Sequence, residues 1–465
     1  MNLEGKRITD ERGQTYELER ELGRGGQGAV YVAKGGRRAI KILFNRSSGR
    51  RELLRGQLQN IRRMHELQGL AIAYPLEMLH PPHLGYVMEL ITGMVPISRL
   101  IYPPRDTGSL AEWYLNSGGL HRRLVLLARC AEVLAQLHSK GLVYSDPSPN
   151  NIFVSADLGA YEIRLIDADN LHYESSSSTR SFHTPGYGAP ELVLGKSGVN
   201  TLTDAHAFAV IAFQTLCLIH PLMGDLVVDG EPELEEKALE GSLPWVDEPD
   251  DQSNATLHGF PRDIVLSPNL KKLCQRCFSE GLREPIKRPG ISQWVENLYS
   301  AADFTVECPD CRSTYYANQR FCSWCGYPRP AQVQLLIKRW EPLSDSKECQ
   351  RFLSNQKILA ALVLTENQSL ILTDRIINGR NALGRQAPGI ELQLEGSNIW
   401  VSSLNSQCFW LSCFDGREQT TVEVQNQRQR VPANDPHRTW LLHFAPVDRS
   451  HRLATFRFVS GGKPS

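Results

Sequence analysis

The 465-residue sequence has no excess of charge of either sign, because lysine plus arginine and aspartate plus glutamate number 51 each. A chain without a global basic or acidic field gives no indication of binding to nucleic acid or to an anionic membrane. Long hydrophobic runs are also missing. The longest, AFAVIAFQTLCLI at 207–219, contains Gln214 and is too short to span a bilayer, so we expect it to form a buried helix.

The first residues, MNLEGKR, lack the apolar core of a signal peptide. Without a secretory signal, the 11 cysteines should be reduced thiols, and closely spaced pairs then suggest a metal site before a disulfide. We therefore expect a cytoplasmic protein. The sequence has no internal repeat, and the serine run at 175–178 is its only low-complexity stretch.

The first 300 residues divide into a β-rich part and a helical part. Strand-like runs accompany one segment of helical composition, at 50–68; the runs lie at 16–18, 29–33, 39–43 and 84–90. From about residue 120 the pattern becomes mainly helical, including 124–137 and 207–219. The sequence predicts an α+β domain with a small sheet-containing lobe and a larger helical lobe.

Four polar residues carry the chemistry of this region: Lys41, Asp146, Asn151 and Asp167. Lys41 ends the run Ala-Ile-Lys, about a dozen residues after the glycine-rich segment 23–28. Asp146 and Asn151 share the run YSDPSPNN, and Asp167 follows the apolar run IRLI. Each pattern alone is weak, but four in this order are hard to obtain by chance. The strand-like run after the glycines favours a hairpin over phosphates rather than a dinucleotide-binding turn.

With these residues, the chain resembles a bacterial protein kinase of the eukaryotic type over roughly residues 15–300. The strongest local match is TPGYGAPE at 184–191. The resemblance implies a two-lobed α+β protein-kinase-like domain at 12–300, with lobes at about 12–90 and 91–300. It also implies that Glu191 pairs with Arg288, and that Asp204 holds the catalytic loop.

The resemblance assigns a role to each of the four residues. Lys41 would contact the α- and β-phosphates of ATP, and Asp146 would orient and deprotonate the substrate hydroxyl. Asp167 and Asn151 would bind Mg²⁺, a hard cation that carboxylate and amide oxygens suit. Further residues would line the nucleotide site, the last three as the hinge: Gly23, Gly25, Gly28, Val30, Ala39, Met88, Glu89 and Leu90. Phosphoryl transfer needs mainly alignment and charge neutralisation, which this set offers.

An acid on the helix after Lys41 should steady its side chain. Glu52 is the nearest candidate and Glu66 lies farther along. Gln57 and Gln59 are alternative occupants of the equivalent position, so the sequence leaves the partner of Lys41 open.

Several neighbouring residues depart from the kinase pattern. Tyr144-Ser145 stands where His-Arg is usual, which removes the cation that receives an activation-loop phosphate, so activity should not depend on that phosphate. Ser148 replaces a lysine, and Asp167-Ala168-Asp169 replaces Asp-Phe-Gly. Two interpretations follow: an active serine/threonine kinase, regulated or targeted by its C-terminal modules, or a nucleotide-binding pseudokinase scaffold. An interaction protein that binds no nucleotide is disfavoured by the glycine loop and Lys41.

Other segments refine the resemblance. HPLMG at 220–224, LPW at 243–245 and Arg288-Pro289 with Trp294 resemble a bacterial subgroup. Its kinases occur beside a metal-dependent phosphatase and a von Willebrand A-type protein in tellurite-resistance clusters, which suggests both as partners besides protein substrates. The hydroxyl-rich segment, Ser175–Ser178 with Thr179, Ser181 and Thr184, is either an autophosphorylation loop or a solvated linker.

Two C-x-x-C pairs, separated by ten residues, lie after the helical region. Four thiolates at this spacing can close a tetrahedral Zn²⁺ site with no open position for water. We therefore predict a structural zinc ribbon at 305–328, with the ligands Cys308, Cys311, Cys322 and Cys325. The remaining cysteines are expected to serve packing, including the pair Cys274 and Cys277.

Residues 335–465 contain short β-like segments separated by turn residues, which predict a β-sandwich or barrel. The segment 383–405 faintly resembles a forkhead-associated domain, in which Arg385 and Ser402 would contact phosphate. Ser403 and Asn405 stand where that domain has arginine and histidine. A β domain for protein contacts, without phosphate recognition, is the favoured alternative.

Overall fold

The computed structural model describes residues 3–26, 28–44, 47–174, 183–342, 355–366, 368–379, 388–405, 408–414, 419–425 and 427–462. The chain folds into two compact units. The first comprises Met1–Trp113, Val125–Arg262 and Pro268–Glu296. The second comprises Tyr114–Leu124, Asp263–Ser267 and Asn297–Ser465.

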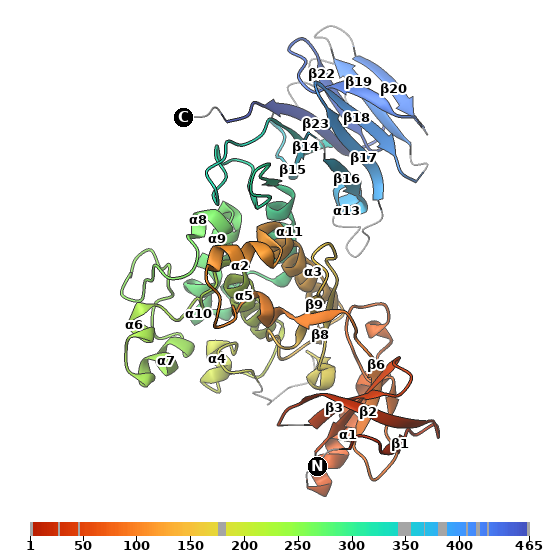
Figure 1. The fold of residues 1–465 in the computed structure, drawn as a ribbon, viewed down its shortest axis with the longest axis vertical. Coiled ribbons are helices and arrows are strands. Elements are labelled where there is room, and N and C mark those ends of the chain that lie inside the picture. Colours follow the sequence, from red (N-terminus) through yellow and green to blue (C-terminus); the bar gives the residue numbers. More distant parts are fainter. Residues whose placement is uncertain are drawn as a thin grey trace. The chain divides into compact units, whose positions relative to one another are not determined.

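A six-stranded antiparallel sheet forms the amino-terminal lobe (Figure 1). Its strands, in sheet order, are β1 (Arg7–Thr9), β2 (Thr15–Arg24), β3 (Gly28–Ala33), β4 (Arg38–Leu43), β6 (Gly85–Glu89) and β5 (Glu77–Met78). Apolar side chains of β3 and β4, such as Tyr31, Ile40 and Ile42, are buried in its core. Helix α1 (Ser48–Arg62) accompanies this sheet and buries Leu58 and Ile61. The strand-like runs predicted at 29–33 and 39–43 therefore form strands that are buried over most of their length.

The helix predicted at 50–68 ends at Arg62. Its apolar periodicity continues into a short 3₁₀ turn, His65–Leu67, where Leu67 is fully buried. A 3₁₀ turn also returns an apolar residue to the same side every third position, so periodicity alone could not locate the helix end.

The helical lobe begins with short strands and turns and continues through a series of helices. Its first elements are β7 (Met94–Pro96), α2 (Leu110–Asn116), α3 (Gly119–Ser139), β8 (Leu142–Val143), β9 (Ile152–Ser155), β10 (Ile163–Leu165), the 3₁₀ turn Ala168–Asn170 and β11 (His172–Tyr173). The later helices are α4 (Pro190–Val193), α5 (Thr201–Cys217), α6 (Asp225–Val228), α7 (Pro232–Leu239), α8 (Arg262–Val265), α9 (Pro268–Phe278), α10 (Glu280–Arg283) and α11 (Ile291–Asp303).

Helix α5 is the buried helix that the apolar run predicted. Asn200 caps its start: the side-chain oxygen accepts the backbone N–H of Leu202 and Thr203, and the Thr203 hydroxyl accepts the N–H of Asn200. Every residue from Thr203 to Cys217 is buried. Among the described residues, none of the helices combines the length and apolar character needed to cross a bilayer.

The second unit contains the cysteine module and a β-sandwich. The hairpin of β12 (Thr305–Glu307) and β13 (Thr314–Tyr316) opens the cysteine module, residues 305–328. Within this unit, Trp324 stacks on Tyr114 with ring centroids 5.4 Å apart, and the N–H of His121 donates to the Thr314 hydroxyl at 2.9 Å. The module therefore packs on residues 114–124, which precede it by almost 200 positions.

Two antiparallel sheets form the sandwich (Figure 1). One has six strands: β15 (Ala360–Thr365), β14 (Gln332–Trp340), β23 (His451–Val459), β22 (Thr439–His443), β19 (Phe409–Phe414) and β20 (Gln419–Val424). The other has four: β16 (Ser369–Thr373), β17 (Pro388–Glu395), β18 (Asn398–Ser403) and β21 (Gln429–Pro432), with the short helix α13 (Asp374–Asn378) after β16. Buried side chains of both sheets form one core, which makes this region a sandwich as predicted.

The described residues do not test the phosphate contacts predicted for this domain. Arg385 lies outside the described residues. Ser402 lies near the end of β18, where it pairs with Glu391 of β17. The described part of the domain therefore adds no observation in favour of phosphate recognition.

Candidate active site and cysteine cluster

The glycine-rich segment forms a hairpin between β2 and β3. The N–H of Gly25 donates to the carbonyl of Gly28 at 2.9 Å, which closes the turn. At Gly28 a Cβ would lie only 2.4 Å from the backbone oxygen of Ile42 in β4, so this position requires glycine. Gly23 and Gly25 have no neighbour within 4 Å of a built Cβ and leave open space along the hairpin.

The other residues expected around the nucleotide lie on neighbouring strands. Val30 pairs with Lys41 across β3 and β4, and Ala39 pairs with Met88 across β4 and β6. Glu89 ends β6, and the N–H of Leu90 donates to the carbonyl of Arg37. Their assignment to the nucleotide remains a proposal.

Lys41 reaches from β4 to the segment that follows β10. Its Nζ lies 2.5 Å from Oδ1 of Asp167 and 2.6 Å from Oδ2 of Asp169. The Tyr86 hydroxyl donates to Oδ1 of Asp169 at 2.5 Å, and the Gln57 side chain donates to the Asp169 carbonyl. Burial acts to lower the pKa of Lys41, but the two carboxylates outweigh burial and raise it. Lys41 is therefore held as a cation between the two lobes.

Asp167 and Asp169 differ in their surroundings. The Asp167 side chain is 39% exposed, whereas that of Asp169 is 7% exposed. Asp167 also has a left-handed backbone, with φ 59° and ψ 48°, which a residue other than glycine rarely adopts. Strain of this kind persists where the surrounding structure fixes it, and it is frequent at functional sites.

Asp146 is bonded to Thr184. The backbone N–H and the hydroxyl of Thr184 both donate to Oδ1 of Asp146 at 2.9 Å, and the hydroxyl lies 3.1 Å from Oδ2. Burial raises the pKa of Asp146; the Thr184 hydrogen bonds oppose this rise and the charge of Asp167 adds to it. The side-chain amide nitrogen of Asn151 donates to the Asp146 carbonyl at 3.1 Å, which leaves the amide oxygen available to accept a further bond or to bind a metal.

Asp204 supports the loop that carries Asp146. Its fully buried carboxylate accepts the N–H groups of Tyr144 at 2.8 Å and Ser145 at 2.9 Å, and it lies 3.0 Å from Nε2 of His138. Ser145 has φ 84°, so the loop reverses sharply just before Asp146. The prediction that Asp204 holds this loop is confirmed.

The Ser145 side chain does not point to an external group. Its hydroxyl donates to the Asn170 carbonyl at 2.9 Å and lies 3.1 Å from Nδ1 of His172. A short internal contact thus occupies the position where kinases of this type usually have an arginine.

The Glu191–Arg288 pair, predicted from the resemblance, is confirmed. The guanidinium of Arg288 donates to both oxygens of Glu191 at 2.6 Å and to the Gly281 carbonyl at 2.7 Å. The Arg288 side chain is fully buried and that of Glu191 is 11% exposed. This bidentate pair fixes the segment 184–191 to the core of the helical lobe.

We expect Arg288→Met to reduce the free energy of unfolding by about 3–5 kcal/mol, because it leaves the Glu191 carboxylate buried without its partner. Urea denaturation measures the change. Arg283→Met is the matched control: Arg283 is exposed, so its replacement should stay within about 0.5 kcal/mol of the parent protein. Equal stability of the two variants would contradict the structural role of the pair.

Sequence reasoning missed Asp169. It sought the acid for Lys41 on the following helix, but Glu52 is exposed and Glu66 accepts the Tyr173 hydroxyl at 3.0 Å. The available signal was the second acid in Asp-Ala-Asp, at a position where the family has glycine. The role of Thr184 was missed too, since it was considered only as a phosphorylation site.

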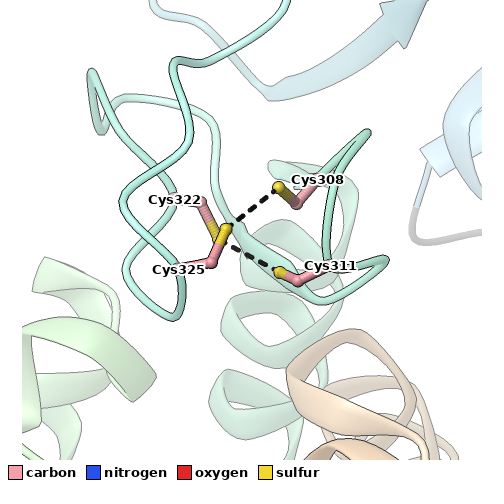
Figure 2. A group of neighbouring side chains, drawn as sticks. All are labelled: Cys308, Cys311, Cys322 and Cys325. Carbon is pink, nitrogen blue, oxygen red and sulfur yellow. Dashed lines mark hydrogen bonds between the residues drawn. The ribbon is translucent and has the colours of Figure 1, made fainter.

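The four cysteines of the module gather as predicted, and their sulfur atoms face one another (Figure 2). All four sulfurs lie within 4.8 Å of one another, with Cys308 and Cys325 at 3.6 Å and Cys311 and Cys322 at 3.7 Å. Zn–S bonds of about 2.3 Å place the sulfurs of a tetrahedral site about 3.8 Å apart, so the cluster fits a zinc ion.

Both C-x-x-C pairs have the same backbone form. Arg312 follows the first pair with φ 60° and donates its N–H to the Cys308 carbonyl at 3.0 Å. Gly326 follows the second with φ 77° and donates to the Cys322 carbonyl at 2.9 Å. Each pair is therefore a tight turn that presents two thiols to the same side.

In this site a lysine of the sheet lobe, Lys41, contacts two carboxylates of the helical lobe. The same lobe supplies the Asp146 carboxylate and the Asn151 amide. This combination of groups is typical of two-lobed phosphotransferases. The chain belongs to the protein kinase family: the family model for the protein kinase domain matches residues 16–300. Membership of this family implies ATP and Mg²⁺ as cofactors.

Three relatives illustrate the similarity. Serine/threonine-protein kinase Pkn1 of Myxococcus xanthus is 29% identical over 213 residues, covering 43% of this chain and 29% of the relative. The DNA damage-responsive serine/threonine-protein kinase RqkA of Deinococcus radiodurans is 30% identical over 222 residues, covering 45% and 31%. Calcium/calmodulin-dependent protein kinase type 1B of Rattus norvegicus is 26% identical over 283 residues, covering 59% and 76%. The chain thus spans less than a third of the two bacterial relatives.

Proposed function

We propose that the chain is an ATP-dependent serine/threonine protein kinase that transfers the γ-phosphate to protein hydroxyls. One observation carries the proposal: Nζ of Lys41 in the sheet lobe lies 2.5 Å from the carboxylate of Asp167 in the helical lobe. Residues 126 positions apart meet at the junction of the lobes, in the order and setting that a phosphate-binding lysine and a metal-binding acid require.

Each residue has a definite task in this proposal. Lys41 binds the phosphate oxygens, and Asp146 accepts the proton of the attacking hydroxyl after Thr184 has fixed its orientation. Mg²⁺, when bound by Asp167 and Asn151, neutralises charge on the phosphates. Ser148 cannot supply the positive charge of the usual lysine, so Lys41 and the metal ligands must provide most of the electrostatic stabilisation.

The test is transfer of labelled γ-phosphate from Mg-ATP to the protein itself and to a generic protein substrate. Asp146→Asn keeps the shape of the side chain but removes the base, and should lower the rate by about 10²–10⁴-fold. Asp157→Asn, in an exposed loop, is the control and should retain the parent rate. If all three proteins bind ATP but transfer no phosphate, the kinase proposal fails and the pseudokinase scaffold takes its place.

Dephosphorylation of the purified enzyme should change its rate by no more than about twofold, because a loop phosphate lacks the arginine that Ser145 replaces. The measurement compares initial rates before and after treatment with a protein phosphatase that is then removed. A large loss of activity that preincubation with Mg-ATP restores would show that another cationic side chain binds the loop phosphate.

We further propose that the cysteine cluster holds one structural Zn²⁺ and that the C-terminal modules target or regulate the kinase domain through protein contacts. All described cysteines are free thiols, which supports the cytoplasmic location proposed from the sequence.

The subgroup resemblance suggests a metal-dependent phosphatase and a von Willebrand A-type protein as partners. Co-purification of each of these two proteins with the full chain tests the proposed partnership. If neither protein co-purifies, the proposal of these partners fails.

A further inference from the structure

The buried carboxylate of Asp169 uses both oxygens inside the protein. Oδ2 lies 2.6 Å from Nζ of Lys41, and Oδ1 accepts the Tyr86 hydroxyl at 2.5 Å. Tyr86 is itself fully buried in β6, and it pairs with Lys41 across β4 and β6. Lys41 and Asp169 are thus joined both directly and through a rigid neighbour on the sheet.

Helix α1 supplies no acid to Lys41. Glu52 is the only acidic residue between Ser48 and Arg62, and it is exposed. The residue of α1 that reaches the site is Gln57, whose side-chain N–H donates to the backbone carbonyl of Asp169. The helix therefore contacts the segment that carries the acid, while the carboxylate comes from the segment itself.

We propose that Asp169 is the positioning residue for Lys41, in the place that an acid on α1 would otherwise fill. The anchor of the phosphate-binding lysine then lies two residues from the metal-binding Asp167, on one short 3₁₀ segment. Lysine anchor and metal ligand move as one piece, and α1 steadies that piece through Gln57 rather than completing the ion pair. The inference rests on the proposed kinase function, and it deepens the account of the same site.

A role for Asp169 as a metal ligand fits the structure less well. A ligand for a nucleotide-bound cation must face the open side of the site, as the 39% exposed side chain of Asp167 does. The side chain of Asp169 is 7% exposed and directed at Lys41 and Tyr86. The carboxylate at 169 orients a cationic side chain instead of a metal.

Moving the carboxylate to the helix tests the proposal in the full-length protein. Asp169→Gly should lower kcat by about 10–100-fold, the usual effect of removing a group that orients a functional side chain. Adding Gln57→Glu to that variant places an acid where α1 meets the segment, and should recover at least about tenfold. Gln59→Glu, the matched control, adds the same charge two residues away and should recover nothing.

Three results would overturn the proposal. The first is an Asp169→Gly enzyme within about twofold of the parent kcat. The second is equal recovery, or equal failure, with Gln57→Glu and Gln59→Glu. The third concerns the Mg²⁺ concentration needed for half-maximal activity. If Asp169→Gly raises this concentration and the addition of Gln57→Glu does not lower it again, Asp169 is a metal ligand, because an acid beside Lys41 would not replace a lost metal ligand.

Melting temperature gives a readout that needs no turnover. Lys41→Met leaves the buried Asp169 carboxylate without its cation, and Asp169→Asn leaves Lys41 with Asp167 as its one remaining carboxylate among the contacts described above. Each variant should therefore destabilise the protein, and the two effects should be far less than additive in the double variant. If the parent protein transfers no phosphate but this coupling is found, the kinase function fails while Asp169 stands as the anchor of Lys41. Additive effects would overturn the anchor, whatever the activity.

Discussion

Replacing Asp167 with alanine is expected to lower kcat for phosphoryl transfer by at least about 10³-fold. A metal ion bound at this carboxylate stabilises transition-state charge by several kcal/mol, and each 1.4 kcal/mol corresponds to a factor of ten. The loss of kcat should be larger still because the variant also changes the surroundings of Lys41. The Nζ of Lys41 keeps Asp169 as a partner but loses the Asp167 carboxylate, which lies 2.5 Å away and balances part of its charge. Single-turnover kinetics with saturating Mg-ATP measures the loss.

Two further variants separate the carboxylate from the backbone. Asp167→Gly accepts φ 59° without strain, so it should be as inactive as the alanine variant and at least as stable. Asp157→Ala removes an exposed carboxylate from a loop and should leave kcat unchanged. An active glycine variant would mean that the strained backbone, and not the metal ligand, explains the loss in Asp167→Ala.

The glycine loop, Lys41, Asp146, Asn151 and Asp167 could be found from sequence because each lies in a short local pattern with a fixed chemical task. Of these residues, Lys41 and Asp167 are in direct contact in the structure. Their individual roles stay proposals until variants are measured. What local patterns cannot give is pairing across the chain: Lys41 and Asp169 are 128 residues apart. An acid on the next helix was expected only because relatives place one there.

The sandwich shows a second limit. Most of its strands were predicted as short β-like segments, but two were not: β14 and β21. Strand β14 lies inside its sheet, paired with β15 and β23, yet it buries Gln332 and Gln334. Each glutamine is hydrogen-bonded, Gln332 to the Ala317 carbonyl and Gln334 to Arg457. Hydrogen-bond partners from other parts of the chain allow these polar side chains to be buried in a core strand. A search for apolar residues alone therefore does not find this strand.

Removing the proposed zinc should unfold the cysteine module, with a loss on the order of 10 kcal/mol of folding free energy at the site. The module has few apolar side chains of its own; its small core includes Cys308 and Cys322 themselves, with Val306, Tyr315 and Ala317. Without the metal, Cys308 and Cys322 are thiols, and no metal–sulfur bond links one C-x-x-C turn to the other. We expect one zinc per chain by metal analysis, and amide exchange across 305–328 should rise sharply after chelation.

The same experiment tests how the module is attached. Trp324 stacks on Tyr114, and the Tyr316 hydroxyl donates to the Val265 carbonyl at 3.0 Å, so chelation should also loosen residues 114–124 and 263–267. Cys322→Ser should reproduce the effect without a chelator, whereas Cys408→Ser, outside the cluster, should keep the metal. Exchange in β3 and β4 of the sheet lobe should not change. A metal-free protein with a protected module would refute the zinc site, since the four sulfurs would then be held together by packing alone.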